Sequence, residues 1–141
     1  MDGDRPGTNC MTATLFVDTN VLVYARDTSD AARRARAFEW MAALWEHRAG
    51  RLSHQVLQEY YVTVTRKLDP PRSVDDARDD VMSLASWRPV VTDIALMDQA
   101  WAVQDRWGFS WWDALVVAAA RRSGASHLLT EDLQHGQDLG G

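Results

Sequence analysis

The chain has 141 residues, of which 46% are hydrophobic and 25% are charged. These values predict one compact domain and exclude a disordered polymer or a fibrous repeat. The 15 basic and 20 acidic residues give a net charge of −5, which weighs against a protein that holds nucleic acid by bulk positive charge. An enzyme whose bound metal ions supply the positive charge remains compatible with this balance.

The apolar runs and the cysteine content bear on the compartment. No apolar run reaches the roughly 18 residues of a membrane span, and no basic-then-apolar leader opens the chain. Cys10 is the only cysteine. A single cysteine excludes an internal disulfide framework and a cysteine-rich zinc site, and it suits a reducing compartment. We therefore expect a cytoplasmic protein that does not contact a membrane.

The first twelve residues are polar, contain two glycines and a proline, and show no periodicity. This pattern predicts a mobile N-terminal leader over residues 1–12 and a domain over residues 13–141.

Apolar spacing predicts the elements of the first half of the domain. We expect strands at residues 15–17 and 51–54 and helices at residues 21–24, 31–47 and 55–68. In the helix over residues 31–47, Phe38, Met41 and Trp45 are expected to face the core, and Gly50 to end the helix. In the helix over residues 55–68, the inward stripe is Leu57, Tyr60, Tyr61, Val64 and Leu68.

The second half begins at the Asp69–Pro71 segment, which must break the preceding helix. Ser73 and Asp76 form a capping box for a helix with Val74, Ala77, Val81 and Leu84 inward. Strands are expected at residues 89–91 and 127–130, and helices at 93–107 and 110–122. The first of these two helices is expected to bury Ile94, Met97 and Trp101. The second is apolar nearly all round and is expected to be central.

Short apolar strands that alternate with helices are typical of crossover connections. Such connections build a parallel sheet that is covered by helices on both faces. The predicted fold class is therefore α/β.

Four acidic residues are candidates for chemistry, and each has a structural alternative. Asp18 and Asp132 follow predicted strands, at the sheet edge where ligands bind in open α/β folds, but aspartate also favours caps and turns. Asp113 lies in the first turn of an almost wholly apolar helix, where it can be a cap, a metal ligand or both. Glu59 falls on the polar side of its helix, so that periodicity alone predicts a solvated glutamate.

Four segments resemble those of the PIN-domain ribonucleases, and most closely those of the VapC toxins of bacterial toxin–antitoxin pairs. The segments are residues 16–22 (FVDTNVL), 53–59 (SHQVLQE), 110–115 (SWWDAL) and 129–136 (LTEDLQHG). They occur in the expected order, and the resemblance covers residues 14–136. It implies a three-layer α/β/α domain with a parallel sheet of strand order 3-2-1-4-5.

The resemblance also implies a cluster of four carboxylates, from Asp18, Glu59, Asp113 and Asp132, that holds Mg²⁺ or Mn²⁺ and hydrolyses RNA. It replaces the solvated interpretation of Glu59. Such a cluster requires neutralising cations, and all-oxygen ligands select hard ions. The polar side chains expected to orient the carboxylates are Thr19, Asn20, Ser110 and Thr130. The implied partners are an RNA substrate, a VapB-like antitoxin and a second copy of the chain in a homodimer.

One departure from the family concerns the end of the chain. The family continues into a fifth strand, whereas this sequence ends at residues 138–141. We therefore expect the order 3-2-1-4, with the fifth strand missing and the fourth strand at an exposed edge. Either another segment or a partner chain covers this edge, or the chain is a shortened or damaged copy.

Other functions are less well supported by the residues. The four histidines have no zinc-binding spacing, and serine hydrolase, P-loop and dinucleotide motifs are absent from the sequence. A phosphotransfer receiver domain would need a lysine near the last strand, but Lys67, the only lysine, lies mid-chain. A non-catalytic PIN-like module that binds RNA or a partner remains the alternative. Trp111 and Trp112, beside Asp113, are candidates for stacking on a nucleobase.

Overall fold

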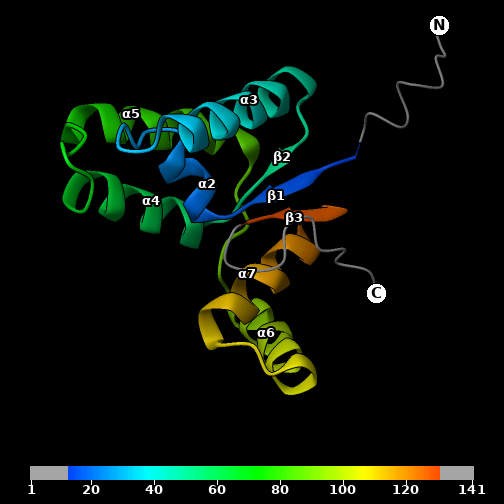
Figure 1. The fold of residues 1–141 in the computed structure, drawn as a ribbon. Coiled ribbons are helices and arrows are strands. Elements are labelled where there is room, and N and C mark those ends of the chain that lie inside the picture. The colour runs from blue at the N-terminus through cyan, green and yellow to red at the C-terminus, as the bar shows by residue number, and fades with distance from the viewer. Residues whose placement is uncertain (1–12, 131–141) are drawn as a thin grey trace, which may run out of the picture.

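The computed structural model describes residues 13–130. The predicted leader (residues 1–12) lies outside the described residues, as do Asp132 and the region in which a fifth strand was considered. Figure 1 shows a small sheet with helices on two sides.

The sheet is parallel and has three strands: β1 (Leu15–Val17), β2 (Gly50–Arg51) and β3 (His127–Leu129). Their order is β2-β1-β3, with Leu15 opposite both Gly50 and His127. The predicted strand at residues 89–91 is reduced to one parallel bridge between Ser53 and Val90. This bridge lies beyond β2, so the predicted order 3-2-1-4 is confirmed within residues 13–130.

Helices connect the strands, and their predicted positions agree with the structure to within a few residues. They are α2 (Thr19–Tyr24), α3 (Ala31–His47), α4 (His54–Arg66), α5 (Val74–Leu84), the 3₁₀ helix η1 (Ala85–Trp87), α6 (Ile94–Trp107) and α7 (Trp111–Arg122). A side-chain oxygen caps the start of each α-helix, as predicted for Ser73, which accepts a hydrogen bond from the Asp76 N–H. No helix in the described part of the chain is both long and apolar enough to span a membrane.

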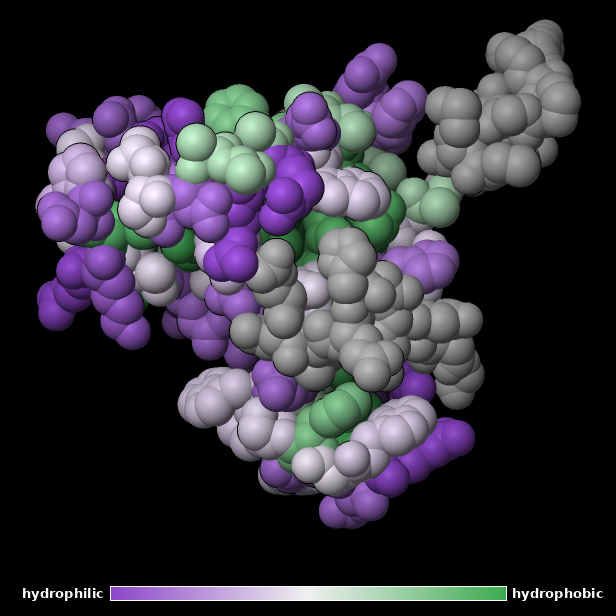
Figure 2. Space-filling model, in the orientation of Figure 1, coloured by the Kyte–Doolittle hydropathy of each residue, from purple (hydrophilic) through white to green (hydrophobic). Residues whose placement is uncertain are grey.

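The helices form two layers around the sheet (Figure 1). Helices α2 to α5 lie on one side, and α6 and α7 lie on the other. The α/β prediction is therefore confirmed. In Figure 2, hydrophilic residues cover the outer ends of α4 and α5, whereas more apolar residues surface around α6 and α7.

The predicted inward faces of α3 and α6 are wrong in part. Met41 of α3 packs against the core and Met97 of α6 is half-buried, but the other side chains predicted beside them are exposed. In α3 the buried residues are Ala37 and Leu44, whereas Phe38 and Trp45 are 49% and 42% exposed. In α6 the buried residues are Leu96, Ala100 and Val103, whereas Ile94 and Trp101 are 73% and 47% exposed. Helix α6 packs against α7, whose buried positions include four alanines. Close approach between two helices selects a face of small residues, so that the bulky side chains lie at the surface.

The predicted end of α3 at Gly50 is also wrong. The helix ends at Arg48, which adopts the left-handed conformation (φ 53°). Gly50 belongs instead to β2, where a Cβ atom would lie 2.2 Å from the Trp87 ring. Glycine at this position therefore allows the Trp87 ring to pack directly against the strand backbone.

Candidate active site at the carboxyl edge of the sheet

Asp18 lies at the carboxyl end of β1, where the chain turns into α2. Its Oδ1 accepts a hydrogen bond of 2.7 Å from the Thr19 N–H, and its Oδ2 accepts one of 2.8 Å from the Thr130 hydroxyl. Its own N–H donates to the Leu129 carbonyl, which ties it to the end of β3. The residue is only 6% exposed. Asp18 is therefore both a helix cap and a buried carboxylate at the edge where ligands bind in open α/β folds.

Glu59 approaches Asp18 through a shared neighbour. The Thr19 hydroxyl donates a hydrogen bond of 2.8 Å to Glu59 Oε1, and the Gln55 side chain donates one of 3.3 Å to Oε2. Thr19 thus binds Asp18 with its backbone and Glu59 with its side chain. The half-buried Glu59 is held by neighbouring residues, and the periodicity-based interpretation as a solvated glutamate is wrong.

Asp113 lies in the first turn of α7, and its N–H donates to the capping Ser110 Oγ at 3.2 Å. A short turn connects α7 to β3, and the helix runs back along the sheet, so that its N-terminus lies toward the carboxyl edge (Figure 1). Within residues 13–130, no hydrogen bond joins Asp113 to Asp18 or Glu59.

The remaining predicted site residues differ in their contacts. Thr19, Ser110 and Thr130 all contact a candidate acid or its backbone. Asn20 lies in the first turn of α2, but its side chain makes no hydrogen bond to another described residue. Asp132 lies outside the described residues.

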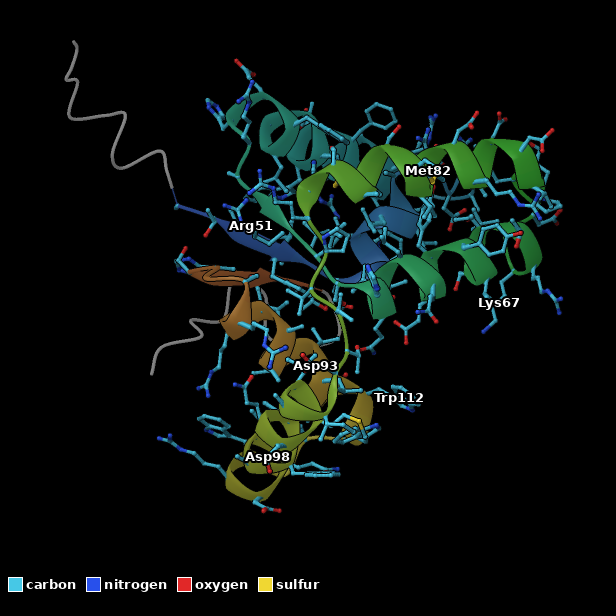
Figure 3. The ribbon with its side chains drawn as sticks, turned by 180° about the vertical axis from the view of Figure 1, so that it is seen from behind. Arg51, Lys67, Met82, Asp93, Asp98 and Trp112 are labelled. Atoms are coloured by element: carbon cyan, nitrogen blue, oxygen red, sulfur yellow. The ribbon has the colours of Figure 1, made fainter. Side chains whose placement is uncertain are left out.

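The two tryptophans beside Asp113 differ in exposure. Trp112 is 61% exposed and points away from the helix pair (Figure 3). Trp111 stacks on Trp101 with ring centroids 6.0 Å apart.

The donor set suits a hard divalent cation, although the described residues do not complete a metal site. Asp18 and Glu59 offer carboxylate oxygens, the ligand type that Mg²⁺ and Mn²⁺ prefer. Within residues 13–130, no group of three or more histidine, cysteine, aspartate or glutamate side chains is arranged to hold a metal ion. The structure thus supplies a linked pair of acids, with Asp113 on α7 in the opposite helical layer.

A second acid with little exposure, Asp80 in α5, is not singled out by the sequence; its side chain is 12% exposed. It accepts hydrogen bonds from Arg72, from the Tyr60 hydroxyl at 2.6 Å and from Arg26 at 3.2 Å. Burial raises the pKa of Asp80, but the hydrogen bonds from Arg72 and Tyr60 and the charge of Arg26 outweigh burial and hold the pKa below its ordinary value. Its charge is balanced within the protein, which indicates a structural role.

Comparison with known proteins gives one family. The family model described as the PIN domain matches residues 15–137. No curated protein matches the chain.

Proposed function

The chain belongs to the PIN domain family, whose members are typically nucleases that use divalent metal ions, and from this premise we propose that it is a metal-dependent endoribonuclease. The proposed reaction is the hydrolysis of an RNA phosphodiester bond with Mg²⁺ or Mn²⁺. The proposed biological role is that of the toxin in a toxin–antitoxin pair.

The observation that carries this proposal is the link between Asp18 and Glu59 through Thr19. Asp18 lies between β1 and α2, Glu59 lies in α4, and the two are 41 positions apart by residue number. A single threonine nevertheless binds both, with hydrogen bonds of 2.7 and 2.8 Å. Positioning two carboxylates in this way at the ligand-binding edge of a parallel sheet is what a metal-dependent nuclease requires.

Each residue then has a proposed task. Asp18, Glu59, Asp113 and Asp132 would hold the metal ions. These ions, when bound, activate water and stabilise negative charge on the phosphate. Thr19 and Thr130 donate to the carboxylates and so fix which oxygen atoms face the substrate. Ser110 caps the first turn of α7, and the N-terminus of this helix favours negative charge.

Arginines close to the carboxyl edge support a phosphate-bearing substrate. Arg33 and Arg36 line a small cavity of about 50 Å³ together with Thr130, the residue that donates to Asp18. The Arg33 guanidinium also lies 4.6 Å from the centre of the Tyr24 ring. An RNA backbone at the edge would therefore meet guanidinium groups that match phosphate geometry.

Exposed aromatic side chains support the proposed protein partners. Phe38 and Trp45 of α3 and Trp101 and Trp107 of α6 are all more than 40% exposed. Apolar surface of this extent is typical of binding faces. We propose a VapB-like antitoxin and a second copy of this chain as partners.

The catalytic proposal is tested by replacing one helix-capping aspartate and comparing it with another. Asp18→Asn should abolish cleavage of a labelled RNA in Mg²⁺ or Mn²⁺, and chelation by EDTA should abolish cleavage by the wild type. Asp30→Asn is the control, since Asp30 also caps a helix, α3, at an exposed site, where it accepts from the Arg33 N–H. Circular dichroism should show that both variants are folded. Cleavage in EDTA, or full activity of Asp18→Asn, would contradict the mechanism.

A non-catalytic PIN-like module that binds RNA or a partner is the second candidate. This alternative predicts that the protein binds RNA without cleaving it and has no affinity for divalent ions.

The toxin role is tested separately by expression in bacteria. Growth should stop and should recover when the product of the adjacent open reading frame is co-expressed, and unimpaired growth would contradict this role.

A further inference from the structure

A cavity of about 710 Å³ lies at the amino edge of the sheet, opposite the edge that carries Asp18. Its wall comes from the segments that lead into the strands. Arg48 and Arg51 flank the start of β2, Arg88 precedes Val90, and Arg122 ends α7 just before β3. The volume falls in the roughly 300–1,000 Å³ range of small-ligand sites. Figure 3 labels Arg51 on β2 at this edge.

The charge of these arginines is mostly unbalanced. Arg122 is paired with Asp93 at 2.9 Å. Arg51 donates only to the backbone carbonyls of Arg48 and Gly50, and neither Arg48 nor Arg88 forms an ion pair within residues 13–130. Four guanidinium groups therefore share one cavity with a single carboxylate partner, in a chain whose net charge is −5.

The backbone gives an independent reason to assign these arginines a role. Within residues 13–130, the only non-glycine residues with positive φ are Arg48 (53°) and Arg88 (56°), and both line this cavity. Each ends a helix in the left-handed conformation, where glycine is preferred because it has no Cβ atom. Strained residues of this kind cluster at functional sites. The placement indicates that the guanidinium groups themselves are needed here.

Two tryptophans form a rigid aromatic wall beside the arginines. Trp45 and Trp87 lie with ring centroids 5.1 Å apart at an angle of 60°. The Trp87 ring packs on the bare backbone of Gly50, which fixes its position. Trp45 is 42% exposed and offers a surface to a ligand. Arginine next to an accessible indole is the combination that binds the phosphate and base of a single-stranded nucleic acid.

The basic surface extends beyond this cavity. Arg122 also lines a neighbouring cavity of about 430 Å³, together with Arg106 and Arg121. These two guanidinium groups lie 4.4 and 4.8 Å from the centre of the Trp107 ring. Arginines and indoles that line two adjoining cavities suit an extended polyanion with flat bases better than a single small anion.

We propose that the amino-edge cavity is a second binding site for the RNA strand, separate from the carboxylate edge. This proposal rests on the proposed function for the identity of the polyanion. An acidic polypeptide could pair with the arginines, but it has no bases to stack on the two indoles. RNA offers phosphates to the arginines and bases to the indoles, so it is the occupant that we propose.

The test is the affinity for a fluorescently labelled single-stranded RNA in EDTA, where no metal-dependent cleavage occurs. Arg48→Gly/Arg88→Gly should weaken binding by at least about 10-fold and reduce the slope of log K against log salt by about 1.4, for two lost phosphate contacts. The same change should leave the melting temperature unchanged or higher, because glycine relieves both left-handed positions. A purely structural role for these arginines would instead lower the melting temperature.

Arg66→Gln/Arg78→Gln is the matched control, because it removes the same charge from exposed positions on α4 and α5. This control should retain wild-type affinity. Trp45→Phe should reduce the quenching of tryptophan fluorescence by RNA. Arg51→Gln/Arg122→Gln repeats the affinity test without altering a left-handed residue and should also weaken binding.

Several outcomes would overturn the proposal. These are wild-type affinity in both arginine double variants, an equal loss in the control, no RNA binding by the wild type, and displacement of RNA by polyglutamate at lower concentration than by unlabelled RNA. The test is independent of catalysis. Binding that depends on Arg48 and Arg88 in a protein that never cleaves RNA would support this site and contradict the nuclease proposal.

Discussion

Asp18 is a buried aspartate and Asp80 a half-buried one, and their surroundings differ. Asp80 accepts hydrogen bonds from two arginines and a tyrosine hydroxyl. The arginines balance its charge within the layer that contains α2, α4 and α5. Asp18 lies at the sheet edge and accepts hydrogen bonds from the Thr19 N–H and the Thr130 hydroxyl. The difference shows that burial does not by itself identify a functional acid. Asp80 is compensated by protein cations and stabilises the fold, whereas Asp18 follows a strand at the carboxyl edge, where we propose its catalytic role.

The largest expected effect is a difference in folding stability between variants of the two aspartates. Asp80→Asn should lower the free energy of unfolding by about 2–3 kcal/mol, because it leaves two half-buried guanidinium groups without their carboxylate. This is less than for a fully buried pair, since the Arg26 and Arg72 side chains are 35% and 24% exposed. Asp18→Asn should cost less than about 1 kcal/mol, because asparagine caps helices as well as aspartate. Urea denaturation of both variants checks this, and equal losses would remove the distinction.

A smaller effect is expected from Thr19, the residue that joins Asp18 to Glu59. Thr19→Val removes the hydroxyl that donates to Glu59 but keeps the backbone N–H that donates to Asp18. RNA cleavage should fall by about 10-fold or more, the usual consequence of losing a group that orients a metal ligand. Thr65→Val, which removes a hydroxyl bonded only within α4, is the matched control. Equal cleavage rates for the two variants would show that the Thr19 link has no role in catalysis.

The smallest effect concerns the pH dependence of stability. Burial, followed by the hydrogen bond to Asp80, raises the pKa of Tyr60 from 10.0 to about 12. The protonated Tyr60 hydroxyl therefore contributes stability that is fully present below pH 10 and is lost as the pH rises toward 12. The ionised Asp80 carboxylate contributes stability that is lost as the pH falls through its lowered pKa. Thermal melts should therefore show an alkaline decline that Tyr60→Phe weakens at a cost of about 1 kcal/mol at neutral pH. An unchanged alkaline decline in Tyr60→Phe would show that another group causes it.

Local patterns predicted the elements well because strands, caps and breaks are encoded within a few residues. The short apolar run before Asp18, the Ser73 cap and the Asp69–Pro71 break all have such local causes. The sheet order came from the resemblance, and hydrogen-bonded strand partners agree with it.

Long-range contacts explain what the patterns missed. The environment of Glu59 depends on a hydroxyl from α2, and nothing in the spacing of α4 reveals it. The inward faces of α3 and α6 were partly misassigned because size was taken as a sign of burial, although Ala37 and Ala100 allow the closer helix packing. Arg48 was missed as the end of α3 because glycine is the usual residue there.

Helix α7 connects the two opposite edges of the sheet. Asp113 lies in its first turn, and Arg122, its last residue, lines the arginine cavity. Twelve helical residues rise about 18 Å. The helix fixes the separation of the two sites that we propose for RNA. Under this proposal, only an RNA long enough to cover that span contacts both ends of α7 at once, and shorter RNAs should bind more weakly.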